Sequence, residues 1–264
     1  MKHPLRAALC GLLSAATLSG SALAARSVPV QVDGDTLPSG AYVESGVTYV
    51  PLRYLLDELG GWTVSWDAQN RQAAAVSSSG GRITASPEKD TVTVNGRAYS
   101  GQVRVQNGRT YVPLRTLAEA LGADVCWDAY LGGAAVTSAD AAYDARDLYW
   151  LSRIICAESG AEPMEGQLAV GNVVLNRVES GEFPDTIPAV IFDRVDGVQF
   201  EPVSNGTVYQ TPCAQSVLSA KRALDGEQAV GSALYFYAPA LSKGTWINAN
   251  RTYYTTIGCH RFYL

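Results

Sequence analysis

The sequence predicts an α+β protein of two domains, in which a repeated module of strands and short helices precedes a domain that opens with two helices. A motif that contains YVPLR, Leu-Gly and Trp-Asp occurs twice between residues 46 and 128. From residue 148 onward, apolar side chains recur at helical spacing, and an aromatic run at 233–237 has the character of a strand. Helices and strands in separate blocks are typical of the α+β class.

The first 24 residues are expected to be an export signal outside the fold. Lys2 and Arg6 precede a short apolar run, and Ala22-Leu23-Ala24 places small residues where a signal peptidase cuts. We expect cleavage after Ala24, and an uncleaved N-terminal anchor is the alternative. No other segment is long and apolar enough to cross a bilayer. The sequence therefore predicts a secreted protein with no stable membrane span once the signal is removed.

Composition and charge narrow the class of protein. The chain has 264 residues, of which 47% are hydrophobic and 17% charged, as in globular proteins of one or two domains. Its net charge is −5, and without the signal it has 18 basic against 25 acidic residues. An acidic chain without a basic cluster is not expected to bind nucleic acid. Charge alone would not draw it to anionic wall polymers either.

The cysteines leave the disulfide state open. Cys10 lies in the expected signal, so Cys126, Cys156, Cys213 and Cys259 remain. Four cysteines in an exported chain permit three pairings, and the spacing does not choose among them. Because there is no CxxC motif and only one histidine after the signal, we expect neither a structural metal site nor a cofactor.

The N-terminal half contains two copies of one motif. Pro51 and Pro113 are 62 residues apart, whereas Trp66 and Trp127 are 61 apart, because the second copy lacks one residue. In each copy a Tyr-Val strand leads to a proline at the expected first position of a helix. The helix stops at a glycine, and a strand ending in Trp-Asp follows. Two copies are too few for a solenoid, so we expect one compact module.

Two further strands are expected between the copies, at 82–84 and 91–94, with Asn95-Gly96 as a hairpin turn. Together with the doubled motif, these segments resemble the copper amine oxidase N-terminal-like domain over residues 28–138. The resemblance implies a stalk module of exported bacterial proteins, without copper chemistry. Its role is either attachment to the wall or a partner, or that of a spacer.

The second domain is expected to fill residues 141–264 and to present a carboxylate at the end of its first helix. Leu151, Ile154 and Glu158 fall on one helical face, and a break follows at 159–163. A glutamate on a core-facing stripe is expected to have a raised pKa, because burial disfavours its charged form. A carboxyl that holds its proton near neutral pH can act as the general acid that cleaves a glycosidic bond.

A second helix is expected from about residue 164 to 178, with Gly171 allowing close approach of the first helix. The ordered motifs of this half are ICAE at 155–158, GQLAVGNVVLNRV at 166–178, FPDTI at 183–187, QFEPV at 199–203, ALYFY at 233–237 and IGCHRFY at 257–263. They resemble the cell wall hydrolase family of spore cortex-lytic enzymes (the SleB/CwlJ group).

This resemblance implies a lysozyme/lytic-transglycosylase-like α+β catalytic domain that cleaves the glycan strands of peptidoglycan. It implies action on the spore cortex or cell wall during germination, and an accessory protein of the spore or wall as a partner. The catalytic glutamate of the family aligns with Glu158. As an acid it would protonate the leaving glycosidic oxygen, and as a base it would then accept a proton from the muramoyl 6-hydroxyl. No second carboxylate is strictly needed for that outcome.

Hydrolysis is the alternative outcome, and it usually needs a second carboxylate. Glu201, Asp185 and Glu162 are the candidates.

The expected substrate-binding residues are Asn176, Gln199, Glu201, Tyr235 and His260. Each also has a structural interpretation, because polar and aromatic groups at these positions can equally hold a loop or pack in the core.

If the resemblance holds, Cys156 and Cys259 would lie near each other, and a disulfide between them is a hypothesis. Two rival classes also remain. A Cys-His amidase would need His260 near a nucleophilic thiol. A wall-binding protein without activity is the other rival, and the intact glutamate speaks against it.

Overall fold

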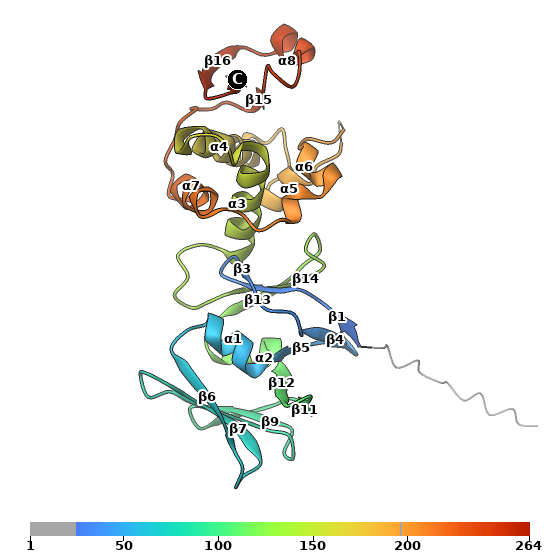
Figure 1. Cartoon of the computed structure of the whole chain (residues 1–264), viewed down its shortest axis with the longest axis vertical. Helices are drawn as coiled ribbons and strands as arrows, with labels where there is room; N and C mark the ends of the chain where they lie inside the picture. Colours follow the sequence, from blue (N-terminus) through green and yellow to red (C-terminus); the bar gives the residue numbers. More distant parts are fainter. Residues whose placement is uncertain (1–24, 196) are drawn as a thin grey trace, which may run out of the picture.

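The computed structural model describes residues 25–195 and 197–264. The expected export signal at 1–24 lies outside the described residues. Among the described residues, no helix is of the length and apolarity that a membrane crossing needs. Figure 1 shows the sheets and short helices of the N-terminal half stacked below the larger helices, with the C-terminal strands at the far end. The α+β class is confirmed.

The two copies of the repeat meet in a central five-stranded sheet. Its order is β1 (Arg26–Ser27), β4 (Tyr42–Glu44), β5 (Val47–Pro51), β12 (Arg109–Pro113) and β11 (Arg104–Gln106). The corresponding strands β5 and β12 pair antiparallel with Val50 opposite Val112. Pro51 lies opposite Tyr111, and Pro113 opposite Tyr49. This register relates the two copies by a local twofold axis through the valine pair.

The helices of the repeat are α1 (Leu52–Glu58) and α2 (Leu114–Ala120). The sequence predicted the preceding prolines at the first helical position, but each lies one residue earlier, at the N-cap. Their φ angles of −59° and −60° suit the extended backbone of that position, so the ring fits the end of the strand. Gly60 and Gly122 follow the helices at positive φ, which confirms the expected glycine stops.

Two more sheets complete the N-terminal half. The first has the order β10 (Arg97–Ser100), β9 (Thr91–Val94), β8 (Arg82–Ser86), β7 (Gln72–Ser77) and β6 (Trp62–Asp67). The second has the order β13 (Asp124–Asp128), β14 (Gly133–Thr137), β2 (Val30–Val32) and β3 (Asp35–Thr36). The expected strands at 82–84 and 91–94 are present in β8 and β9. One hydrophobic core, which includes Leu55, Leu56 and Leu117, joins the helices to the sheets.

Three helices form the centre of the C-terminal half: α3 (Ala145–Ser159), α4 (Met164–Ser180) and α7 (Ala214–Leu224). The shorter helices α5 (Ile187–Ile191), α6 (Glu201–Asn205) and the 3-10 turn η1 (Thr207–Tyr209) lie beside α3. The predicted close approach at Gly171 is confirmed, because an added Cβ there would lie 2.9 Å from Ile155 Cδ1.

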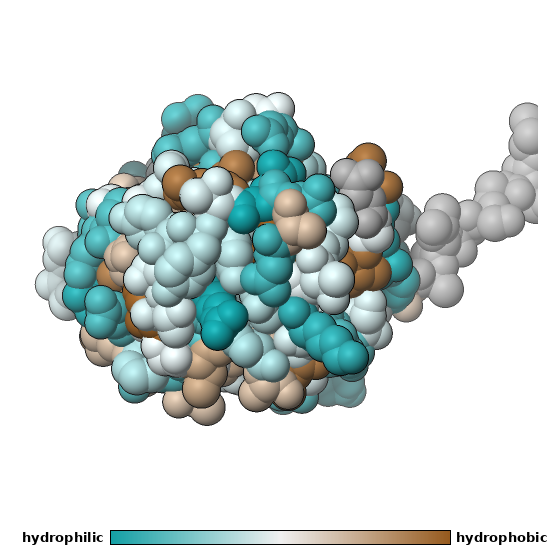
Figure 2. All heavy atoms as spheres, turned by 90° about the horizontal axis from the view of Figure 1, so that it is seen from above, coloured by the Kyte–Doolittle hydropathy of each residue, from teal (hydrophilic) through white to brown (hydrophobic). Residues whose placement is uncertain are grey.

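The chain ends in a small antiparallel sheet with the order β15 (Tyr235–Tyr237), β17 (His260–Tyr263) and β16 (Tyr253–Ile257), next to α8 (Thr245–Asn250). Seen from this end, the surface is mostly hydrophilic or neutral, and hydrophobic side chains are few and scattered (Figure 2). Two large rings of this end, Trp246 and Tyr253, are more than half exposed.

A buried carboxylate joins the two halves. Asp128, which is 1% exposed, accepts a hydrogen bond from Trp150 Nε1 of α3 at 2.6 Å. It also accepts from the backbone N–H groups of Tyr130 and Leu131. The corresponding Asp67 of the first copy instead bonds to its neighbour Asn70 in an exposed turn. The aspartate of the motif thus stabilises a solvent-exposed turn in the first copy, whereas in the second copy it binds α3.

Candidate active site

The side chain with the clearest chemical potential is Glu158, in the last turn of α3. The N-terminus of the helix is capped by Asp144, whose carboxylate accepts from the N–H groups of Arg146 and Asp147. The buried residues Leu151 and Ile154 hold the helix against the core. Glu158 therefore lies at the end of a helix that is fixed at its start and along its length.

The pKa of Glu158 is raised to about 7. Burial is the largest cause, and the negative charge of Glu201 adds to it, whereas the positive charge of Arg177 opposes both. The C-terminal end of a helix also disfavours a negative charge. The rise that the apolar stripe predicted is present, so at neutral pH a substantial fraction of this carboxyl holds its proton.

Glu158 opens into a cleft of about 410 Å³. Its lining comes from the last turns of α3, from the α6–η1 segment and from one residue further along, and consists of Arg153, Cys156, Ala157, Glu158, Glu201, Pro202, Asn205, Thr207, Gln210, Thr211 and Leu241. Glu201, the first residue of α6, is exposed. Of the three candidate second carboxylates, only Glu201 shares the cleft with Glu158. Asp185 is not in the lining, and Glu162 accepts the Cys259 N–H at 3.0 Å instead.

Arg177 of α4 is the cation that acts on Glu158. It is 5% exposed, and its Nε donates to the Leu234 carbonyl at 2.8 Å. Its guanidinium lies 4.6 Å from the Phe183 ring centre and 5.2 Å from that of Phe200. Burial lowers its pKa to about 10, which still leaves it charged at neutral pH. A fixed cation near Glu158 stabilises the carboxylate once its proton has left.

Two of the predicted substrate-binding residues gather around Arg177. Gln199 Oε1 accepts from Arg177 Nη1 at 3.4 Å. The Tyr235 ring centre lies 5.6 Å from the Arg177 guanidinium carbon, and its hydroxyl accepts from Arg251 at 2.5 Å. Neither lines the cleft. Both side chains thus contact the cation that acts on Glu158.

Asn176 and His260 lie in other surroundings. Asn176 Nδ2 donates to the carbonyls of Gly231 and Ala233 at 2.7 and 2.9 Å, which ties α4 to the segment before β15. His260 is 6% exposed and packs edge-on against Phe236 at 5.4 Å between ring centres. Burial lowers the pKa of its imidazole. Neither side chain lines the cleft that contains Glu158.

The sequence did not single out Arg153, which lines the cleft from α3. It is 5% exposed, its guanidinium carbon lies 3.4 Å from the Tyr149 ring centre, and Nη1 donates to the Tyr149 carbonyl. A signal existed, because an arginine within the apolar run Leu151–Ile155 must be buried or turned aside. The polar cleft residues of the α6–η1 segment, such as Asn205 and Gln210, had no sequence signal.

The structure does not contain the disulfide between Cys156 and Cys259 that the sequence suggested. Cys126, Cys156, Cys213 and Cys259 are all unpaired in the structure. Cys156 Sγ accepts from the backbone N–H of Cys213 at 3.4 Å, so its neighbour is Cys213, at the start of α7. Cys259 lies beside Glu162. Within 25–195 and 197–264 no hydrogen bond joins a thiol to His260, which gives the Cys-His mechanism no support.

Comparison with protein families identifies both halves of the chain. The copper amine oxidase N-terminal domain model matches residues 31–136, and the cell wall hydrolase model matches residues 161–263. The second match begins three residues after Glu158 and so does not include it. The two matched segments coincide with the repeated module and with most of the helical half.

Individual proteins are similar to about half of this chain. The chain is 33% identical over 126 residues to a spore cortex-lytic enzyme of Halalkalibacterium halodurans, covering 48% of this chain and 37% of that protein. It thus spans well under half the length of that relative. The catalytic domain of the germination-specific lytic transglycosylase SleB of Bacillus anthracis is 34% identical, with 47% of this chain and 98% of that chain covered and a TM-score of 0.43.

A shorter relative covers the domain more completely. The cell wall hydrolase CwlJ of Halalkalibacterium halodurans is 33% identical over 100 residues, which are 36% of this chain and 68% of that protein. A match of this identity over two thirds of a whole protein, together with the family model over residues 161–263, assigns the family. This chain belongs to the cell wall hydrolase family.

Proposed function

We propose that the protein is an exported enzyme that cleaves the glycan strands of peptidoglycan as a lytic transglycosylase, with Glu158 as its general acid and base. The observation that carries the proposal is a carboxyl with a pKa of about 7 at the wall of a cleft. Membership of the cell wall hydrolase family supports the substrate class. The names of the longer relatives, spore cortex-lytic enzymes, favour the spore cortex as the wall that is cut.

The first step uses the protonated form of Glu158. The carboxyl gives its proton to the glycosidic oxygen as the bond from that oxygen to the anomeric carbon breaks. Positive charge develops at the sugar, and the new carboxylate is stabilised by the buried cation Arg177. A pKa near the working pH suits this step, because the group must both hold and release a proton.

The second step uses the carboxylate that the first step leaves. Glu158 accepts the proton of the muramoyl 6-hydroxyl while that oxygen bonds to the anomeric carbon and closes an anhydro ring. The proton lost in the first step is thereby restored, and no water is consumed. One carboxyl is therefore enough for the whole cycle.

Hydrolysis is the second candidate outcome, and the position of Glu201 in the same cleft as Glu158 favours it. Glu201 is the only other carboxylate in the described lining of the cleft. A second carboxylate on the same cleft can activate water or stabilise the charged sugar. We propose that Glu201 contacts the substrate in either case, and that Gln199 and Tyr235 act through Arg177.

We also propose two domains, a stalk at 28–138 and a catalytic domain at 141–264. Export and location in the cell wall or spore cortex are part of the same proposal. An accessory protein remains a prediction from the family resemblance.

The product of the reaction tests the proposal. Purified cortex and vegetative peptidoglycan would be digested with the chain from residue 25 onward, and the released fragments identified by mass spectrometry. We expect anhydromuramoyl ends from the native protein and none from Glu158→Gln. Reducing ends that depend on Glu158 would establish hydrolysis instead. Equal release by both proteins would rule out Glu158 as the catalytic group.

A further inference from the structure

The N-terminal module contains two open grooves that the proposed reaction does not use. One, of about 460 Å³, lies between α1, β6 and the β11–β12 hairpin. The other, of about 480 Å³, lies between α2, β13 and the β4–β5 hairpin. Each groove thus takes its helix and Trp strand from one copy of the repeat and its hairpin from the other copy.

The grooves are equivalent under the local twofold axis. Leu52 and Trp66 line the first, and Leu114 and Trp127, their counterparts in the repeat, line the second. Trp66 pairs with Ala73 across its hairpin, and Trp127 pairs with Ala134, and both alanines are also in the linings. The crossed hairpins follow from the antiparallel pairing of β5 with β12, which brings each turn beside the opposite helix.

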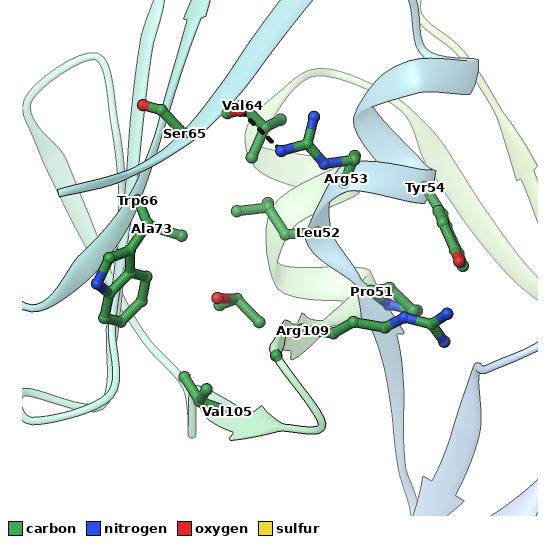
Figure 3. A pocket seen from close by; sticks show the side chains of 12 residues that line it. Pro51, Leu52, Arg53, Tyr54, Val64, Ser65, Trp66, Ala73, Val105 and Arg109 are labelled. Atoms are coloured by element: carbon green, nitrogen blue, oxygen red, sulfur yellow. Dashed lines mark hydrogen bonds between the residues drawn. The ribbon is translucent and has the colours of Figure 1, made fainter. Parts of the chain in front are cut away.

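Each groove presents an indole ring and an arginine. Trp66 is 50% exposed and Trp127 44%, although both stand in a structured module with its own core. Figure 3 shows Trp66 on β6 with Leu52 and Arg53 of α1 across from it. Arg53 donates to the Val64 carbonyl at 2.9 Å, which holds its side chain over the groove. Among the residues that the structure describes, no aspartate or glutamate lines either groove.

The two grooves are not equally charged. The first also contains Arg109, whose guanidinium carbon lies 5.2 Å from the Tyr54 ring centre. In the second, Val47 takes the place of Arg109, and Arg115 is paired with Glu119 at 3.0 Å. The first groove is therefore the more basic and the more aromatic, although the chain as a whole is acidic.

We propose that the twin grooves bind the glycan strands of peptidoglycan, with a sugar ring on each tryptophan and a stem-peptide carboxylate on the neighbouring arginine. An exposed indole face offers a flat apolar surface to a sugar ring. Arginine is the side chain best suited to a carboxylate. The first groove, with Arg53 and Arg109, presents local positive charge on a chain that is acidic as a whole. The choice of peptidoglycan over other anionic glycans rests on the proposed function.

Two equivalent sites on one module imply bivalent attachment. Once one groove holds a strand, the other meets the same polymer at a raised effective concentration. Weak single sites then give a firm hold that still allows the catalytic half to move to new bonds. This is the attachment role that the sequence left undecided against a simple spacer.

Co-sedimentation with purified insoluble peptidoglycan tests the proposal. The chain from residue 25 would carry Glu158→Gln so that the polymer stays intact. We expect Trp66→Ala to lower the affinity about tenfold, in line with buried aromatic contacts at interfaces, and Trp127→Ala to lower it less. The double variant should bind more weakly than either single variant, because each single variant still has one intact groove. Val76→Ala, an exposed apolar position of β7 outside both grooves, is the matched control.

Cys126 supplies a second reporter, because it lines the groove of Trp127. Soluble peptidoglycan fragments should slow its alkylation, and Trp127→Ala should remove that protection while Trp66→Ala leaves it. Circular dichroism of each variant checks that the fold is intact.

Binding by the double variant equal to that of its parent would overturn the proposal. The proposal would also be overturned if the protein sedimented with cell walls that retain other anionic polymers but did not sediment with purified peptidoglycan. Tryptophan-dependent binding by a chain that does not cleave any glycan would uphold the grooves and refute the proposed function. If the protein cleaves soluble glycan strands but binds peptidoglycan equally well without the two tryptophans, the proposed function stands and the groove proposal fails.

Discussion

Two glutamates share one cleft but differ in surroundings. Glu158 is the last but one residue of a 15-residue helix whose inner face is buried, and a negative charge is disfavoured near the helix C-terminus. Glu201 is the first residue of the short helix α6 and is exposed to solvent. A helix N-terminus favours a negative charge. The same type of side chain is thus buried with a raised pKa at one wall of the cleft and exposed to solvent at the other.

The comparison shows that burial and position along a helix suit one of the two carboxyls to the proposed role of acid. The charge of Glu201 is itself one reason for the raised pKa of Glu158. Arg177 of α4 limits that rise. The pKa of Glu158 is therefore set by burial, by a like charge in the same cleft and by an opposite charge on another helix.

The largest expected effect is on activity, and it separates the two glutamates most sharply. Glu158→Gln removes the only proton donor that the mechanism uses, so the rate of glycan cleavage should fall about a thousandfold. The measurement is the rate of release of soluble fragments from peptidoglycan at pH 6. Glu201→Gln is the comparison variant, and in a lytic transglycosylase it should lower the rate far less, because it loses a substrate contact but keeps the proton donor. Comparable losses in both variants would indicate a two-carboxylate hydrolase.

The next effect is on stability, and it depends on pH. The folded-state pKa of Glu158, about 7, exceeds its ordinary value of 4.5, so the folded protein binds the proton more tightly than the unfolded chain. The folded state therefore loses stability as pH rises from about 4.5 to 7, and the full penalty remains above that window. Removing the charge should recover about 1–3 kcal/mol at pH 8 and almost nothing at pH 4.

Thermal unfolding of Glu158→Gln and the native protein at pH 4 and pH 8 measures this difference. The variant should melt higher only at pH 8. Glu201→Gln, at an exposed position, should show no comparable gain. A gain for Glu158→Gln that is the same at both pH values would mean that burial does not act through the charge.

Much of the fold could be predicted because its signals are local or repeated. The doubled motif predicted two strand–helix–strand units, and the glycines after α1 and α2 end those helices as expected. The position of the prolines was wrong by one residue, because a strand and a helix meet there without a loop. The crossing of the hairpins between copies had no local signal, since it depends on how β5 and β12 pair.

The features of the candidate site also divide into those with a local sequence signal and those that depend on distant contacts. The raised pKa of Glu158 could be predicted because a charge on an apolar helical stripe is visible in the sequence. The neighbour of Cys156 could not, because Cys213 comes close only through the packing of α7 on α3. Arg177 contacts the ring of Phe183 from the next segment and the carbonyl of Leu234 from far along the chain. Roles that depend on such distant contacts cannot be inferred from spacing.

The smallest effect is a shift in pH dependence, and it tests how the two glutamates are coupled. The free enzyme must carry its proton on Glu158, so kcat/KM should fall as pH rises through about 7. Glu201→Gln removes a negative charge that raises this pKa, so the falling limb should move to lower pH, by about half a unit. Asp185→Asn, at an exposed position outside the cleft, should leave the limb unchanged. A limb that stays in place in Glu201→Gln would show that the charge of Glu201 does not contribute to the pKa of Glu158, and that the second glutamate serves only the substrate.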